Sequence, residues 1–276
     1  MSARAKGKGK NASFHGIGIK IQRAEVQLRT LEREFESIVD AQLYVFRPEI
    51  HDEGRTHIYK AVNPPPVGVY WGAKIGEVVH SLRSALDHLA WQLVIAEGNL
   101  PNHRTQFPVC NRKPTKRVIK CLPHPRKRDR LRISGKIPPR ALAIIEAVQP
   151  YHRTNDSRRI DEINQLDIFD KHRDLIVTTT AVHMASTHWN EDGRKATTTQ
   201  FTGKPVENDN VIAIVKYDPP QLEPDPNLKF TTYVTFAKGS PYAGELVFRF
   251  LWELWDFVAN DLMVRFDEWV PMKGAP

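Results

Sequence analysis

The chain has 276 residues, 41% of them hydrophobic and 26% charged, which is the composition of a globular protein and excludes a disordered one. Its net charge of +8 favours polyanionic partners such as nucleic acid. Two cysteines without a CxxC pair argue against a zinc site or a disulfide framework, and no apolar run reaches the roughly 18 residues that a transmembrane helix needs.

The N-terminal residues 1–14 are predicted to form a flexible basic tail, either a solvated terminus or an arm for nucleic acid. No apolar segment follows this basic start, so it does not read as a secretory signal, and we expect the protein in the cytoplasm. Residues 15–276 are expected to form a single α+β domain. It would have a helical part at about 15–176, a strand-rich part at about 177–240 and a C-terminal helix at about 244–269.

The first third of the chain predicts two long helices with a hairpin between them. Apolar residues recur at spacings of three and four from Ile17 to Ile38, which is typical of an amphipathic helix. Residues 43–62 mix β-branched and aromatic residues around HDEGR and predict a hairpin, which the prolines of NPPPVG end. A second helix is predicted from Val69 to Ala96, with Gly98 as its stop signal.

The rest of the chain, after Gly98, predicts shorter helices and strands. TQFPVC at 105–110 predicts a short strand, and helices are predicted within 138–151 and 161–177. Strands are predicted within 175–184, 195–203, 210–218 and 228–237, and the aromatic-rich residues 244–269 predict a helix that serves as core or as an apolar dimer face. Helices on either side of these strands indicate a helical bundle with long amphipathic helices plus an antiparallel β-sheet in the C-terminal half.

The second helix carries polar residues opposite its apolar seam, here called the polar stripe. Its members are His80, Arg83, Ser84, Asp87, His88 and Trp91. A stripe that faces water would be an ordinary exposed helix face with i,i+4 neighbours. However, no Lys or Glu lies between Glu77 and Glu97, which indicates a covered face. Covered polar groups need partners, and such pairing is either structural or catalytic.

Arg83 and His88, in RSALDH, have the spacing R-x4-H. In this setting the helix resembles the HEPN superfamily, whose members are helical-bundle proteins and often metal-independent ribonucleases that act as dimers. The resemblance implies that Arg83 stabilises a phosphate while His88 transfers a proton as a 2′-hydroxyl attacks, with Asp87 or His80 orienting them. It covers about residues 69–96. Ser84 and the strands of 177–236 depart from the family pattern.

A second group of polar residues lies in LDIFDKHRD, where Asp170, His172 and Arg173 are candidates to support the polar stripe. The alternative is a plain helix end with charged pairs. The whole chain also resembles bacterial and phage proteins that pair LRSALDHLAW with such an LDxxDKHR segment, a resemblance that implies no particular activity. His80, Asp87, His88, Asp170 and His172 could together ligate a metal. Without an HExxH or HxH spacing, we expect neither a metal nor another cofactor.

Residues 112–136 are the most basic stretch, with eleven Lys or Arg residues against one acid, Asp129. Its net charge near +10 exceeds the +8 of the whole chain, so the rest of the protein is close to neutral. The stretch is either a solvated loop or a contact for phosphates that does not depend on sequence. Candidate phosphate-binding residues are Arg126, Lys127, Arg128, Arg130 and Arg132.

Two functions are consistent with these features. One is a nucleic-acid-directed protein, with RNA favoured, that acts as a HEPN-like endoribonuclease of a bacterial or phage system through Arg83 and His88. The other is a non-catalytic nucleic-acid or protein-binding module whose polar stripe is a buried structural network. A homodimer is compatible with both functions, and neither involves a membrane.

Overall fold

The computed structural model describes residues 12–40, 44–65, 69–113, 137–173, 177–183, 195–200, 205–224, 228 and 230–269. The chain divides into two compact units. The helical unit comprises Met1–Leu28, Ile75–His172 and Leu251–Pro276, and the sheet unit comprises Arg29–Lys74 and Arg173–Phe250. Residues 1–11 of the predicted tail lie outside the described residues, and the single domain stays a prediction.

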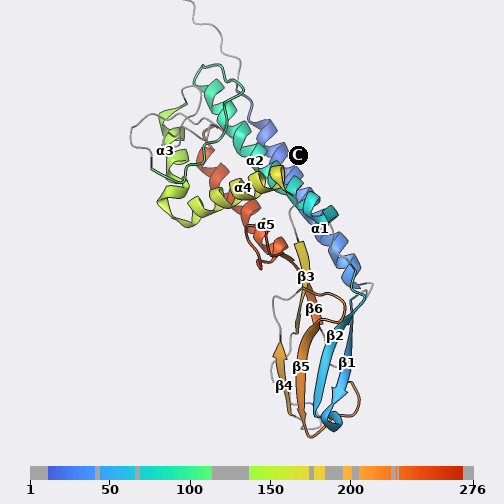
Figure 1. Ribbon diagram of the computed structural model, residues 1–276. Coiled ribbons are helices and arrows are strands. Elements are labelled where there is room, and N and C mark those ends of the chain that lie inside the picture. Colours follow the sequence, from blue (N-terminus) through green and yellow to red (C-terminus); the bar gives the residue numbers. More distant parts are fainter. Residues whose placement is uncertain are drawn as a thin grey trace, which may run out of the picture. The chain divides into compact units, whose positions relative to one another are not determined.

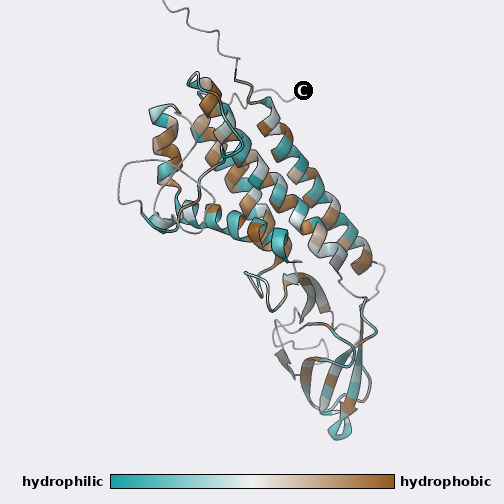
Figure 2. Ribbon diagram, turned by 45° about the horizontal axis from the view of Figure 1, so that its top comes forward, coloured by the Kyte–Doolittle hydropathy of each residue, from teal (hydrophilic) through white to brown (hydrophobic). Residues whose placement is uncertain are grey.

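Both long helices are confirmed. Helix α1 spans His15–Asp40 and helix α2 spans Val69–Ala96, so each contributes to both units. Within the helical unit the two helices run side by side, and brown and teal residues alternate along them (Figures 1 and 2). Helix α2 ends as expected, because Gly98 has a φ of +75° and its N–H reaches Ile95 O at 2.8 Å. The apolar seams of both helices are buried at Ile17, Ile21, Ala24, Leu28, Ile75, Val78, Val79, Leu82, Leu86, Leu89 and Leu93.

Three further helices complete this bundle. Helix α3 spans Pro139–Ala147 and helix α4 spans Asn155–His172, and both were predicted. Thr154 caps α4, since its hydroxyl accepts a hydrogen bond from Ser157 N at 3.2 Å. Helix α5 begins at Val247 and ends at Asp256, and the chain continues as a π-helix at Phe257–Leu262 and a 3-10 turn at Met263–Phe266. The predicted C-terminal helix is therefore helical from Val247, and its second half consists of a wider π-helix followed by a tighter 3-10 turn.

The sheet unit holds six antiparallel strands among the described residues: β1 (Val45–His51), β2 (Thr56–Val62), β3 (Val177–His183), β4 (Lys195–Gln200), β5 (Val211–Asp218) and β6 (Phe230–Phe236). One sheet has the order β1-β2-β5-β4, and β3 pairs with β6. The α+β class is confirmed. The predicted hairpin, β1–β2, joins the C-terminal strands through β5, with Tyr59 opposite Ala213.

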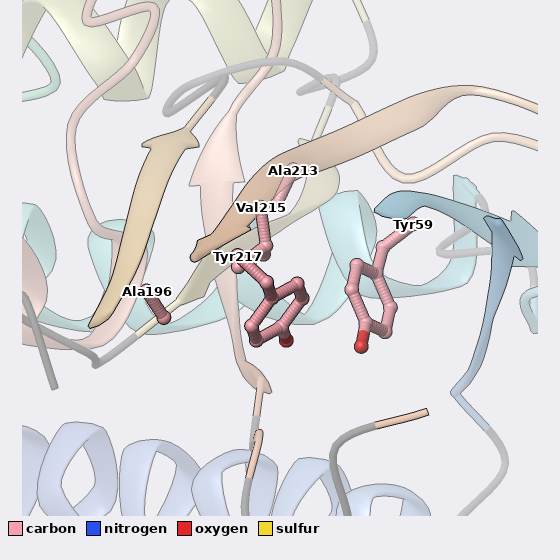
Figure 3. Packing of buried hydrophobic residues seen from close by; sticks show 5 residues of the cluster. All are labelled: Tyr59, Ala196, Ala213, Val215 and Tyr217. Carbon is pink, nitrogen blue, oxygen red and sulfur yellow. The ribbon is translucent and has the colours of Figure 1, made fainter. Parts of the chain in front are cut away.

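An aromatic cluster fills one face of this sheet. Tyr59, Ala196, Ala213, Val215 and Tyr217 pack together, and the rings of Tyr59 and Tyr217 lie side by side in Figure 3. The inward residues of β2 alternate with half-buried ones, as a sheet with one covered face requires. Among the described residues, no helix is both long and apolar enough to span a bilayer.

Candidate functional site

The polar stripe of α2 is neither fully exposed nor fully covered. Arg83 is 6% exposed, whereas Trp91 is 37% exposed and His80 lies at the surface. Ser84, Asp87 and His88 are half-buried. The five-residue step from Arg83 to His88 turns about 140° around a helix axis, so these two side chains lie at opposite edges of the stripe. The structure therefore divides the stripe into a buried edge and an open edge.

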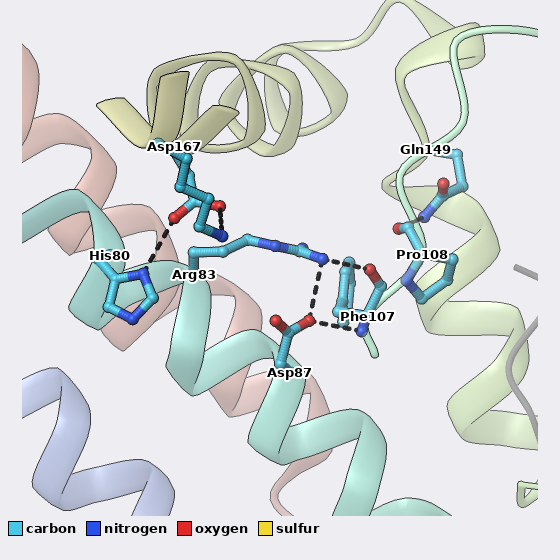
Figure 4. A network of polar contacts seen from close by, with 8 residues as sticks. His80, Arg83, Asp87, Phe107, Pro108, Gln149 and Asp167 are labelled. Carbon is cyan, nitrogen blue, oxygen red and sulfur yellow. Dashed lines mark hydrogen bonds and ion pairs between the residues drawn. The ribbon is translucent and has the colours of Figure 1, made fainter. Parts of the chain in front are cut away.

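The buried edge holds the contacts of Arg83 with Asp87 and Phe107, here called the Arg83 network (Figure 4). Nη2 of Arg83 lies 2.9 Å from Asp87 Oδ1 and donates a hydrogen bond to Phe107 O at 2.8 Å. Phe107 N donates to the same carboxylate oxygen at 2.8 Å. Both backbone groups of Phe107 are thus bound by side chains of one helix, while its ring is buried in the core.

The opposite side of this loop is held by Gln149, which is fully buried after α3. Its Nε2 donates to Pro108 O at 3.0 Å and to Ile145 O at 2.9 Å, and its Oε1 accepts from Cys110 N at 3.0 Å. The prediction of a strand at residues 105–110 is therefore wrong, since this segment has no strand. Side chains of α2 and Gln149 bind the backbone groups that a neighbouring strand would have bound.

Asp87 connects the buried edge of the stripe to its open edge. Burial raises the pKa of its carboxyl group, although the charge of Arg83 and the N–H of Phe107 work against this shift. Its side chain is 36% exposed, in contrast to 8% for the side chain of Arg83. Arg83 is thus enclosed by structural partners, and only Asp87 of this pair reaches the open edge.

His80 meets helix α4 at Asp167. Its Nδ1 donates to Asp167 Oδ1 at 3.1 Å, and Lys171 Nζ donates to Asp167 Oδ2 at 2.6 Å. The carboxylate of Asp167 is buried, while the His80 ring is largely exposed. The His80–Asp167 contact joins α2 to α4, and it places His80 at the rim of the stripe.

The predicted supporting residues lie at and just after the end of α4. Asp170 lies against the α2 backbone, because a Cβ on Gly76 would lie 2.0 Å from its Oδ1. His172 and Arg173 are exposed. Within the described part of the chain, no group of three or more His, Cys, Asp or Glu side chains converges on a metal position. The geometry therefore gives no support to the metal alternative for His80, Asp87, His88, Asp170 and His172.

The open edge of the stripe forms a pocket of about 280 Å³, here called the α2 pocket. Helix α2 supplies most of its wall, α1 supplies Lys20, and the loop after α2 supplies Thr105. Lys20 Nζ donates to Ser84 Oγ at 2.7 Å. Lysine, hydroxyl and carboxylate groups thus surround one hollow beside an indole. The lining residues are Lys20, Ser84, Asp87, His88, Trp91 and Thr105.

His88 forms the back of this pocket. Its Nε2 accepts from Gln92 Nε2 at 3.0 Å, and the amide is oriented by Ser13 N, which donates to Gln92 Oε1 at 2.8 Å. The other side of the ring packs on α1, where a Cβ on Gly16 would lie 2.3 Å from His88 Cε1. Burial lowers the pKa of His88, and the charge of Lys20 lowers it further. His88 is therefore a neutral wall of the pocket near pH 7.

The basic residues predicted to bind phosphate cannot be placed beside this pocket. Arg126, Lys127, Arg128, Arg130 and Arg132 lie outside the described residues, and only Arg112 and Lys113 of that stretch are described, both exposed. Their role stays a prediction.

Sequence reasoning missed Lys20, Phe107 and Gln149. Lys20 is one of several basic residues on the polar face of α1, and no local signal separates it from the others. Phe107 contributes its backbone N–H and carbonyl, and Gln149 contributes its side-chain amide. Neither residue belongs to a motif with a distinctive spacing in the sequence. The lack of Lys and Glu on the stripe was the useful signal, because it indicated the covered edge correctly.

Comparisons with protein-family models, with curated proteins and with solved structures find no match to this chain. The resemblance to HEPN proteins therefore stays a prediction that rests on residues 69–96.

Proposed function

We propose that this chain is a nucleic-acid-binding protein, with RNA favoured, whose Arg83 network serves architecture rather than catalysis. The observation that carries the architectural role is the enclosure of Arg83. Its Nη2 is bound to Asp87 and to a backbone carbonyl, and its Nη1 is buried without a hydrogen-bond partner among the described residues. Arg83 is 6% exposed, so the guanidinium has no open face for a phosphate. A catalytic arginine must contact the transferring phosphate directly.

The charge distribution supports the nucleic-acid partner. Residues 112–136 carry eleven Lys or Arg residues against one acid, while the rest of the chain is nearly neutral. A concentrated basic segment binds phosphates through counterion release, and such binding weakens steeply as salt rises. Cytoplasmic location and assembly into a homodimer belong to the same proposal and rest on the sequence alone.

Salt-dependent binding of RNA tests this proposal. Binding is followed by the fluorescence anisotropy of a labelled RNA single strand of about 20 nucleotides. The logarithm of the association constant should fall linearly with the logarithm of the salt concentration, with a slope of about −0.7 per neutralised phosphate. Replacing five basic residues by Gln should lower both the affinity, by about tenfold or more, and the slope. The replaced residues are Arg126, Lys127, Arg128, Arg130 and Arg132.

A matched control removes the same charge from exposed residues elsewhere and should leave most of the affinity intact. It replaces Arg23, Arg33, Arg47, Arg153 and Lys216. No binding at low salt, or an equal loss in both variants, would contradict the proposal.

Endoribonuclease activity is the second candidate, because His88 and Asp87 both line an open pocket beside Lys20. His88 could accept a proton there only after Gln92 releases its Nε2. RNA incubated with the protein in EDTA separates the two candidates. Intact RNA supports the non-catalytic reading, whereas cleavage that disappears in His88→Ala would overturn it.

A further inference from the structure

The α2 pocket combines groups that the Arg83 network leaves unused. Lys20 and Asp87 both line it, so a cation and a carboxylate share one hollow. Ser84 uses one of the three N–H donors of Lys20, and two donors remain for an acceptor in the pocket. These donors suit a phosphate, which Lys binds as a point charge.

Trp91 and Asp87 suit a different part of a ligand. The indole of Trp91 is 37% exposed, and an exposed aromatic face at a pocket can stack a nucleobase. Arg83 and Phe107 are both bound to Oδ1 of Asp87, while part of the carboxylate faces the pocket. A carboxylate accepts hydrogen bonds, so it favours a base that carries an exocyclic amine.

The volume of the pocket suits one nucleotide. Pockets for drug-sized ligands begin at roughly 300 Å³, and this one measures about 280 Å³. It therefore matches the size of a single base with its sugar and phosphate. His88 offers such a ligand no free ring nitrogen, because its Nε2 is bound by Gln92 and its Nδ1 is buried.

We propose that the α2 pocket binds a single unpaired nucleotide whose base carries an exocyclic amine, with its base on Trp91, its amine at Asp87 and its phosphate at Lys20. This inference rests on the proposed function, in that the nucleotide would be one unit of a bound RNA strand. A bare phosphate is a poorer ligand, since Asp87 repels it and Trp91 contributes nothing to its binding.

The test uses the full chain and adenosine monophosphate as the probe, with binding followed by calorimetry. Adenosine monophosphate should bind at least fivefold more tightly than uridine monophosphate and far more tightly than inorganic phosphate, because stacking and the amine contact add to the phosphate contact. Trp91→Ala and Lys20→Met should each weaken binding by about tenfold, whereas Trp91→Tyr should retain most of it.

Two controls separate these effects from general damage. Arg23→Met removes an exposed charge from the same helix as Lys20, and Tyr70→Ala removes an aromatic ring that is 62% exposed outside the pocket. Both should bind adenosine monophosphate as the unaltered chain does. Circular dichroism verifies that every variant is folded.

The failure of this inference is distinguishable from the failure of the proposed function. If RNA binds with salt dependence but adenosine monophosphate does not bind, or binds equally well to Trp91→Ala, the pocket proposal is overturned and the proposed function stands. If adenosine monophosphate binds through Trp91 while the RNA strand does not bind at all, the pocket is a nucleotide site and the proposed function fails.

Discussion

The Arg83 network and the α2 pocket lie on one polar stripe and share Asp87, yet they differ in every physical respect. Arg83 is enclosed and bound to a carboxylate and a carbonyl, while Ser84, one residue later, faces an open hollow with Lys20. A turn of 100° per residue separates the two environments. Polar residues on one helix face therefore need not form one site. Four predictions test this division, in order of decreasing effect.

Removal of the guanidinium should have the largest effect. Arg83→Met leaves the carbonyl of Phe107 without its buried donor and removes the cation beside the partly exposed Asp87, so the free energy of unfolding should fall by about 3 kcal/mol. Urea denaturation measures this change. Lys20→Met removes the same charge from the pocket and should cost less than about 1 kcal/mol. Equal losses in the two variants would erase the distinction between network and pocket.

The loop that carries Phe107 should depend on Gln149 almost as strongly. Gln149→Met leaves the carbonyls of Pro108 and Ile145 and the N–H of Cys110 without this partner, and burial of such groups costs about 1–3 kcal/mol. We expect a loss of about 2–3 kcal/mol in urea denaturation. Gln106→Met, at a half-buried position in the same loop, serves as the comparison and should cost much less. A loss below about 1 kcal/mol for Gln149→Met, the size of an ordinary surface change, would show that the loop does not need the amide.

The pocket wall can be tested by two glycines of the same helix. Gly16→Ala places a Cβ 2.3 Å from His88 Cε1, whereas Gly18→Ala meets nothing within 4 Å. The first substitution should destabilise the protein by about 1–2 kcal/mol through overpacking. The second should stabilise it by up to about 1 kcal/mol, since Ala favours a helix more than Gly does. If both changes stabilise the protein, His88 does not pack against α1 as described.

The smallest effect concerns pH. The pKa of His88 is lowered in the folded protein, so the unfolded chain binds this proton more readily. The contribution of neutral His88 to the free energy of unfolding is fully present above the ordinary pKa of histidine, about 6.5. It is lost as the pH falls through the lowered pKa. Between about pH 7.5 and about pH 5, the free energy of unfolding should therefore fall less in His88→Gln than in the unaltered chain. Denaturation curves recorded at each pH measure this change.

His172→Gln supplies the control for this pH dependence, because His172 is exposed at the end of α4. It should retain the slope of the unaltered chain. The raised pKa of Asp87 changes the stability in the opposite direction as the pH falls. Asp87 is present in all three proteins and therefore does not affect their comparison. Identical slopes in His88→Gln and the unaltered chain would contradict the burial of His88.

The candidate site was foreseen only in part. The absence of Lys and Glu from the stripe indicated a covered face, and Arg83 confirms it. The R-x4-H spacing suggested that Arg83 and His88 act together, yet it separates them by about 140° around the helix. The role of Lys20 depends on a contact with Ser84 across 64 positions of the chain, which no local pattern encodes.

Local sequence patterns suffice to predict the helices and strands, because the periodicity of apolar residues and the prolines and glycines at the ends of elements act within a few positions. The bounds Val69–Ala96 of α2 and the strands β1 to β6 were therefore predictable. Three features are not encoded locally: the pairing of the β1–β2 hairpin with β5, the binding of the Phe107 loop by Gln149 and the open edge of the stripe. These outcomes depend on contacts between distant residues, whose selection is set by the packing of whole elements.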